Sequence, residues 1–372
     1  MKDTPTKVFI VSDLYGKNAA GAGRATRLLA EELHRQGVTV TLFAVHLQGD
    51  NDSGLPVGTA WVNRGCRYHW PERTLAFQIK LAVNREKPVF AIVVGITYLT
   101  RLLLKSSFAS KVAVWETTNA NPGNKFIDEE ALRNIHRCLA ILSPSDTIDR
   151  GIRETYAYQG SIVRLPYWIP DISSLPREKV NPLKYDFVYL GRLDVEKGIN
   201  ELITAFAALK KKRLGRLAIC GFGKAEPFQR KAKELGIAES VDIYPNASEE
   251  TVENIMQSAR WYVLPSYHEG YPLSILEAAR RGIPIIATSA GSVLEMVGRS
   301  EAALLIPPRN IDALVSVMEY TSSESELEYA RRCKAACHVF SQLSSAAVVR
   351  DHVTSAVTHL LSLSKKVRQS FC

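Results

Sequence analysis

Several features are missing from this 372-residue sequence. No apolar run approaches the roughly 18 residues that a membrane-spanning helix needs. The six cysteines are scattered and form no Cys-x-x-Cys pair, so we expect neither a zinc site nor a disulfide framework. The first residues lead directly into a strand-like segment and lack the shape of a secretory signal peptide. These absences favour a cytoplasmic protein.

The charge balance is basic, with a formal net charge of +9. Such a balance suits nucleic acid, anionic lipid or a phosphorylated ligand. The sequence has no zinc-finger spacing and no aromatic-rich basic strand of the RNA-binding type, so nucleic acid is not an expected partner. With 46% hydrophobic and 23% charged residues, the composition is that of an ordinary globular protein.

Apolar runs that do not alternate recur along the chain, separated by helical stretches. They occupy residues 7–14, 38–45, 90–96, 111–117, 139–144 and 161–166 in the first half, and residues 185–192, 216–223, 241–244, 261–266, 283–291 and 303–308 in the second. Runs of this kind indicate parallel strands covered on both faces. The sequence therefore predicts an α/β protein built on parallel sheets.

A proline-rich stretch without periodicity, residues 166–186, divides the chain. We expect two doubly wound, Rossmann-like domains, residues 1–168 and 169–340, that face each other across a ligand cleft. Residues 341–372 have a helical pattern and contain no strand-like run.

The segment SYHEGYPLSILEAARRGIP follows an apolar run and contains two glutamates. Pro272 suits the first position of a helix. That position would make Tyr271 the N-cap, where it is a poor capping residue. Uncapped N–H groups beside a glycine favour a bound anion. Glu269 would lie in the loop and Glu277 near the middle of the helix, and the alternative is that both are ordinary solvated side chains.

The segment GRLDVEKG follows the first strand-like run of the second domain. It places Arg192 and Lys197 at the carboxyl end of that strand, where both side chains can bind phosphate. The alternative is a turn with ordinary surface charges.

Two Gly-x-Gly segments resemble nucleotide loops but are incomplete. A dinucleotide fingerprint needs a third glycine, and Thr26 occupies that position after Gly21 and Gly23. The segment with Gly221 and Gly223 fails in the same way. Both failures disfavour a nicotinamide-dependent oxidoreductase.

A metal site is not expected. Asp50 and Asp52 form an Asp-x-Asp pattern, but they lie in a polar loop that no strand delivers. The sequence has no clustered ligand set for a transition metal.

Three kinds of group thus converge at the predicted strand ends of the second domain. Arg192 and Lys197 can bind a diphosphate, a helix N-terminus offers N–H groups, and Glu269 and Glu277 can accept hydrogen bonds from sugar hydroxyls. A nucleotide diphosphate sugar has a partner for each of them.

The same segments, in this order and spacing, resemble the retaining glycosyltransferases of family 4, which have the GT-B fold. The resemblance is strongest over residues 185–310, and GAGRATRLLAEELHRQG resembles the glycine loop of that family's first domain. It implies that a last helix within residues 341–372 crosses back to the first domain.

The resemblance also implies roles for particular residues. Arg192 and Lys197 would bind the donor diphosphate, Glu269 would face the transferred sugar, and Glu277 would hold the ribose hydroxyls. These three residues, Glu269, Arg192 and Lys197, would carry the catalysis. Further donor contacts are implied at Gly21, Gly23, Gly221, Gly223, Gly270, Tyr271, Pro272 and Leu273, with Val241 to Ala247 near the base.

One position departs from the family pattern. Many members carry a histidine near the sugar at the end of the fourth predicted strand, where this chain has Trp115 and Glu116. These two residues are therefore the candidates on the acceptor side.

The expected function is retaining transfer of a hexosyl or N-acetylhexosaminyl group from a nucleotide diphosphate sugar to a glycan or lipid-linked acceptor. Surface polysaccharide or glycolipid synthesis is the expected setting. Glu-Gly-Tyr-Pro, by resemblance, favours a uridine diphosphate sugar. No cofactor or metal is expected. The alternatives are a non-catalytic nucleotide-sugar or lipid-binding protein of the same fold and, less favoured, the oxidoreductase.

Basic residues accumulate between positions 64 and 111, with apolar residues between them. They are Arg64, Arg67, Arg73, Lys80, Arg85, Lys87, Arg101, Lys105 and Lys111, against Glu72 and Glu86. Such a surface can lie on anionic lipid without spanning it. The family resemblance implies that this lipid would be the inner face of the cell membrane, where many members glycosylate lipid-linked acceptors. The alternative is a solvated basic face that keeps the protein soluble.

Overall fold

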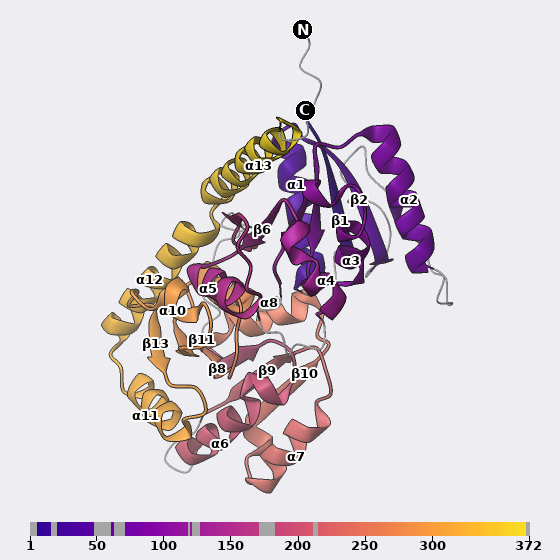
Figure 1. Cartoon of the computed structure of the whole chain (residues 1–372). Helices are drawn as coiled ribbons and strands as arrows, with labels where there is room; N and C mark the ends of the chain where they lie inside the picture. The colour runs from indigo at the N-terminus through magenta and orange to yellow at the C-terminus, as the bar shows by residue number, and fades with distance from the viewer. Residues whose placement is uncertain are drawn as a thin grey trace. The chain divides into compact units, whose positions relative to one another are not determined.

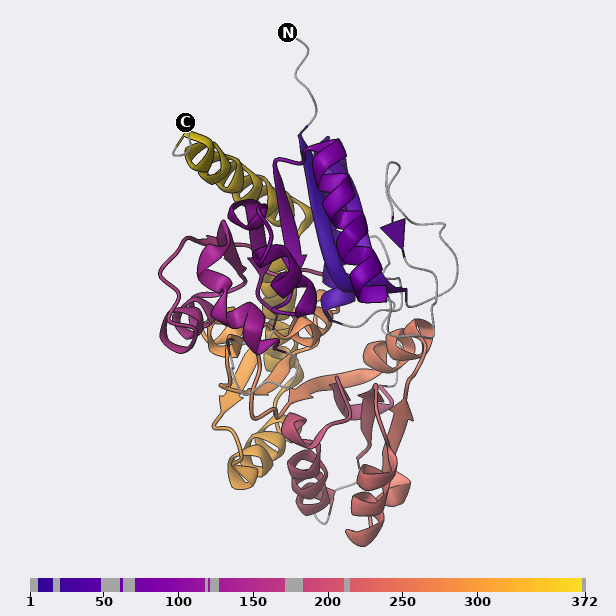
Figure 2. The same ribbon diagram turned by 45° about the vertical axis from the view of Figure 1, so that its right-hand side comes forward.

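The computed structural model describes residues 6–15, 21–47, 61–62, 71–117, 120, 127–170, 183–210 and 215–369. The chain forms two compact units, Met1–Trp168 with Val349–Cys372, and Ile169–Val348 (Figures 1 and 2). The first crossing between them falls within the proline-rich stretch 166–186. Each unit is built around its own parallel sheet.

The first unit has a seven-stranded sheet in the order β3-β2-β1-β4-β5-β6-β7, with every pairing parallel. Its strands are β1 (Lys7–Tyr15), β2 (Thr39–Leu47), β3 (Trp61–Val62), β4 (Phe90–Val94), β5 (Val112–Trp115), β6 (Ala140–Ser143) and β7 (Ile162–Arg164). The main connecting helices are α1 (Ala22–Arg35), α2 (Pro71–Glu86), α3 (Tyr98–Leu104), α4 (Glu129–Arg133) and α5 (Asp146–Thr155). Strands β4, β5 and β6 are buried at every residue, which explains their non-alternating apolar sequences.

The second unit has a six-stranded sheet in the order β10-β9-β8-β11-β12-β13, again parallel throughout. Its strands are β8 (Tyr185–Leu190), β9 (Leu217–Gly221), β10 (Val241–Pro245), β11 (Ala259–Leu264), β12 (Ile285–Thr288) and β13 (Ala303–Ile306). Its helices are α6 (Ile199–Lys210), α7 (Glu226–Glu234), α8 (Glu249–Gln257), α9 (Leu273–Arg280), α10 (Val293–Val297), α11 (Ile311–Ser322) and α12 (Glu326–Ser344). Every strand expected from the sequence is present, and β3 is an additional one.

The last helix, α13 (Ala346–Gln369), returns the chain to the first unit (Figure 1). Its buried residues Val349, Val353, Ala356 and Leu360 recur at helical spacing and form an apolar stripe. Ser364 donates a hydrogen bond to the carbonyl of Val89 at 3.2 Å. The expected return of the last helix to the first unit is therefore confirmed.

No helix in the described ranges combines the length and the apolar character needed to cross a membrane.

Candidate active site

The strand order of the second sheet reverses between β8 and β11. The chain continues from β8 to β9 on one side and from β11 to β12 on the other. Ligands of open α/β sheets bind at the carboxyl ends of the strands at such a point. Arg192 and Lys197 follow β8, and Glu269 follows β11, so the fold delivers all three predicted residues to this place.

Lys197 and Glu269 form an ion pair at the reversal point. Nζ of Lys197 lies 2.7 Å from Oε1 of Glu269, and the two side chains are 15% and 8% exposed. The alternative that Glu269 is a solvated loop residue is therefore wrong. Because an ammonium group has three N–H donors, Lys197 can bind Glu269 and an anion together.

Backbone contacts hold the two loops at this distance. The N–H of Tyr267 donates to the carbonyl of Glu196 at 2.9 Å. Gly198, directly after Lys197, has a φ of +69°, and a Cβ atom there would lie 2.0 Å from the carbonyl oxygen of Pro265. Only glycine permits both this conformation and this approach.

Gly291 supports the Glu269 loop from the other side. It has a φ of +57°, and a Cβ atom would lie 1.7 Å from the carbonyl oxygen of Glu269. We expect Gly291→Ala to lower the free energy of unfolding by about 2–4 kcal/mol, from left-handed strain plus displacement of the loop. Gly236→Ala is the matched control, since Gly236 has a φ of +70° with nothing within 4 Å. Urea unfolding measures both, and equal losses would contradict the packing argument.

Helix α9 begins one residue later than expected. Pro272 is the N-cap, with φ −70° and ψ 107°, so Leu273 is the first helical residue and Tyr271 precedes the cap. Proline's fixed φ fits both positions, and the extended ψ decides between them. No side chain caps this helix. The N–H of Ile275 donates to the carbonyl of Pro272 at 3.1 Å, which leaves the N–H groups of Leu273 and Ser274 to bind an anion.

Glu277 lies in α9 and is buried. Its Oε2 accepts hydrogen bonds from Arg280 at 2.6 Å and from Arg281 at 2.7 Å. Arg281 also binds Glu253 of α8. Burial opposes the charge of Arg281, but the bonds to Glu253 and Glu277 prevail and raise its pKa above the ordinary value. The network fixes the orientation of the Glu277 carboxylate and excludes the solvated alternative.

Arg192 differs from Lys197 because it is exposed. Its Nη1 lies 3.2 Å from Oδ2 of Asp194, in the same loop. The fold therefore places Arg192 at the reversal point and leaves its side chain open to solvent.

Gly221 and Gly223 have a structural role at the end of β9. A Cβ atom on Gly221 would lie 1.5 Å from the carbonyl oxygen of Gly191, and one on Gly223 would lie 2.9 Å from that of Leu193. These glycines let β9 end directly against the loop that carries Arg192. Their contact with a donor stays a prediction, as does the position of the base beside Val241 to Ala247.

Two buried tyrosines beneath the site were not expected from the sequence. Tyr189 donates to the carbonyl of Arg192 at 2.7 Å, and Tyr262 donates to that of Leu190 at 3.3 Å. Burial first, and then the neighbouring Tyr262 and Glu269, raise the pKa of Tyr189 well above its usual value. Burial likewise raises the pKa of Tyr262, so both hydroxyls remain protonated donors that fix the end of β8. The sequence signal that could have pointed to them is the presence of a tyrosine inside each of two apolar runs.

The predicted residues of the first unit have different settings. Gly21 is the N-cap of α1, with a φ of +55°, and Gly23 is buried in the first turn. Trp115 is fully buried, donates to the carbonyl of Leu165 at 3.1 Å and stacks on Tyr167, so its indole is part of the core. Glu116, also buried, follows β5 and accepts a hydrogen bond from Tyr156 at 3.3 Å.

Asp50 and Asp52 lie outside the described residues. Within the described ranges, no three histidine, cysteine, aspartate or glutamate side chains gather closely enough to hold a metal ion.

The second unit matches a known family. Residues 174–337 match the family model described as glycosyl transferases group 1. The MMP alpha-(1->4)-mannosyltransferase of Mycolicibacterium hassiacum is 34% identical over 126 residues, which is 33% of this chain and 30% of the relative. The D-inositol 3-phosphate glycosyltransferase of Jonesia denitrificans is 27% identical over 165 residues, 41% of this chain and 38% of the relative. The chain thus matches about a third of the length of these curated relatives.

Solved structures match over nearly the whole chain. A glycosyltransferase from Rickettsia africae gives a TM-score of 0.75 at 15% identity, covering 96% of this chain and 98% of that one. Anabaena Alr3699/HepE in complex with UDP-glucose gives 0.72 at 14% identity, covering 95% and 99%. The chain therefore has the GT-B fold, with two Rossmann-like units.

Proposed function

We propose that this protein is a retaining glycosyltransferase that moves a sugar from a nucleotide diphosphate sugar to a glycan or lipid-linked acceptor. The observation that carries the proposal is the buried Lys197–Glu269 pair at the reversal point of the second sheet, inside the region that matches the family. Structural neighbours crystallised with UDP and UDP-glucose favour a uridine diphosphate donor. The relatives' names favour a hexosyl or N-acetylhexosaminyl group.

The proposed mechanism follows from charge. The bond between the anomeric carbon and the diphosphate oxygen breaks, and negative charge grows on the leaving diphosphate. Lys197, Arg192 and the uncapped N–H groups of α9 stabilise that charge. The acceptor hydroxyl oxygen bonds to the anomeric carbon, and its proton passes to the departing diphosphate or to solvent. Glu269 holds the sugar and Glu277 the ribose hydroxyls.

Lys197, Arg192 and the N–H groups of α9 would together stabilise the diphosphate without a divalent metal. The reaction is therefore expected to proceed in the presence of a chelator. Retention of configuration requires either a covalent intermediate or attack from the face of the leaving group, and NMR of the first product reports the stereochemistry.

A thermal-shift panel of UDP, GDP, ADP and their sugars tests the proposal. A ligand at 100 times its Kd adds about 2.7 kcal/mol to the free energy of unfolding. We expect UDP and one UDP-sugar to raise the Tm most. Release of UDP on addition of an acceptor separates a transferase from a non-catalytic binder. A shift with NAD(P) and none with any sugar nucleotide would instead support the oxidoreductase.

We also propose that the first unit binds the anionic inner face of the cell membrane, where lipid-linked acceptors for surface polysaccharide or glycolipid synthesis would lie. One structural neighbour is the lipopolysaccharide outer core galactosyltransferase WaaB, and this likeness favours such a setting. Within α2, Phe77 and Leu81 are 61% and 53% exposed at i, i+4 spacing, and Lys80 between them is also exposed. Helix α2 therefore offers an apolar edge flanked by positive charge.

Three of the cations expected on this surface are paired with acids. Arg85 lies 2.9 Å from Glu86. Arg101 binds Asp128 at 3.0 Å, and Lys105 binds Glu130. They are therefore poor candidates for lipid contact. Arg64 and Arg67 lie outside the described residues. These findings shift the proposed contact to α2.

We expect Phe77→Ser with Leu81→Ser to abolish most sedimentation with anionic vesicles at low salt, because insertion of the apolar edge is lost. Lys80→Gln should weaken it about fivefold, since a cation near the surface contributes about 1 kcal/mol. Leu327→Ser is the matched control, because Leu327 is an exposed leucine of the second unit. Binding of UDP should not change. If all variants sedimented as much as the wild-type protein, the α2 proposal would be contradicted. The same holds if the wild-type protein itself did not sediment.

A further inference from the structure

Tyr267 lies two residues before Glu269 and contacts the loop after β8, helix α6 and the loop before α11. Its backbone N–H donates to Glu196, its hydroxyl donates to the carboxylate of Glu201, and its ring lies under the guanidinium of Arg309 at 4.2 Å. Burial, and then the bond to Glu201, raise the pKa of Tyr267 to about 12. The hydroxyl is therefore a protonated donor at neutral pH.

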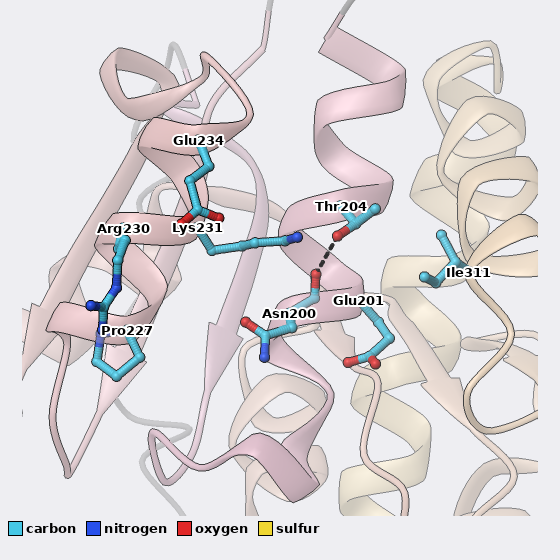
Figure 3. Close-up of a pocket in the computed structure, with 8 residues that line it drawn as sticks. All are labelled: Asn200, Glu201, Thr204, Pro227, Arg230, Lys231, Glu234 and Ile311. Atoms are coloured by element: carbon cyan, nitrogen blue, oxygen red, sulfur yellow. Dashed lines mark hydrogen bonds between the residues drawn. The ribbon is translucent and has the colours of Figure 1, made fainter.

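Glu201 belongs to the first turn of α6, four residues after Lys197. Its Oε1 accepts from Tyr267, and its Oε2 is buried without a hydrogen-bond partner among the described residues. Glu201 lines a pocket of about 380 Å³ between α6 and α7. Figure 3 shows Lys231 of α7 reaching towards α6 there. Among the described hydrogen bonds, the one that the Glu201 carboxylate accepts comes from the hydroxyl of Tyr267.

Arg309 lies between β13 and α11 with a φ of +61°. A left-handed arginine costs about 1–2 kcal/mol, and such strain persists where surrounding contacts hold it. Here the side chain covers the ring of Tyr267, at the carboxyl edge of the same sheet. The ring is thus held from one side and the hydroxyl from the other.

These contacts bracket the Lys197–Glu269 pair. The segment from Glu196 to Glu201 carries Lys197, and the segment that begins at Tyr267 carries Glu269. Two hydrogen bonds, through the backbone and the hydroxyl of Tyr267, join the two segments on either side of the 2.7 Å ion pair. A shift of either segment would change that distance.

We propose that Tyr267 is a positioning residue that, held by Glu201 and Arg309, fixes Glu269 against Lys197 for sugar transfer. This role rests on the proposed function. This role affects the two parts of the donor, the ribose and the sugar that is transferred, differently. The ribose contact at Glu277 comes from α9 and does not depend on Tyr267, whereas alignment at the anomeric carbon does. Tyr267 should therefore affect kcat for transfer and leave the Kd of UDP nearly unchanged.

The test is a double-mutant cycle on Tyr267→Phe and Glu201→Ala. UDP is the probe of binding. The probe of catalysis is the nucleotide sugar that most stabilises the wild-type chain, and the reaction measured is the slow transfer of its sugar to water. Each single variant should lower kcat about tenfold, the effect of one lost hydrogen bond to a charged group. The double variant should be no worse than either single one. Glu201→Gln, whose amide oxygen still accepts, should recover most of the loss.

Tyr329→Phe is the matched control, because its ring also lies under an arginine, Arg260 at 3.9 Å, and its hydroxyl donates to the carbonyl of Arg260 at 2.9 Å, away from both site loops. It should lower Tm without changing kcat. Additive losses in the cycle, or a fall in Tm with unchanged kcat in Tyr267→Phe, would overturn the positioning role alone. A wild-type chain that neither binds nor cleaves any sugar nucleotide would overturn it together with the proposed function.

Discussion

Glu277→Gln is expected to weaken binding of UDP about 10- to 100-fold. A carboxylate that accepts from ribose hydroxyls makes charge-assisted hydrogen bonds worth about 1.5–3 kcal/mol, and each 1.4 kcal/mol is a factor of ten in Kd. Arg280 and Arg281 already hold one oxygen of this carboxylate, so little side-chain entropy is lost when ribose binds. Calorimetry with UDP measures the change directly.

The same network means that Glu277 also stabilises the fold. Removing one partner of a buried ion pair costs about 3–5 kcal/mol, because the remaining charge is uncompensated. Glu277→Ala would leave the buried Arg281 with Glu253 alone, and it should lower Tm more than Glu277→Gln. Stability must therefore be measured beside affinity, so that loss of folded protein is not mistaken for loss of binding.

Glu253→Gln provides the matched control. Glu253 binds the same guanidinium from α8, so its loss should lower stability in a similar way. The ribose contact is assigned to Glu277, so the Kd of UDP should stay within about twofold of wild type. Equal weakening of UDP binding by Glu253→Gln and Glu277→Gln would assign the effect to the network as a whole. Wild-type affinity in Glu277→Gln would rule out the ribose role.

The sequence predicted the elements better than their ends. Buried parallel strands have a strong pattern because both faces are covered, and each expected strand is present. β3 has two residues, too few to form a pattern. Pro272 was placed one residue too far inside α9, since its φ is the same at both positions.

The individual residues of the candidate site could be predicted from the sequence, but the ion pair between two of them could not. Lys197 and Glu269 are 72 residues apart, and their contact depends on β11 lying beside β8, which local pattern does not specify. The bonds from Glu277 to Arg280 and Arg281 follow from i, i+3 and i, i+4 spacing in a helix, so this signal was present in the sequence. Trp115 was chosen because it stands at the strand end where many family members carry a histidine. Its burial shows that a strand end alone does not expose a side chain.

Lys197→Ala is expected to lower kcat about 10²- to 10³-fold, the effect of removing one preorganised group that stabilises developing charge. The reason for a larger effect on kcat than on KM is the ion pair itself. Before the reaction the charge of Lys197 is compensated by Glu269 at 2.7 Å. Its attraction to the diphosphate grows only as the bond to the sugar breaks, and an interaction that strengthens in the transition state raises kcat. Steady-state kinetics with the preferred nucleotide sugar measures both constants.

Two further variants separate catalysis from stability. Lys197→Ala leaves Glu269 buried without its cation, so the double variant Lys197→Ala/Glu269→Gln should regain part of the lost Tm but none of the lost kcat. Lys184→Ala removes an equal charge from the start of β8, where Lys184 lies 3.8 Å from Asp242, and should leave kcat unchanged. If Lys197→Ala kept full kcat, or if Lys184→Ala lowered it equally, the leaving diphosphate would be stabilised by groups other than Lys197. Arg192 and the N–H groups of α9 would then carry that charge.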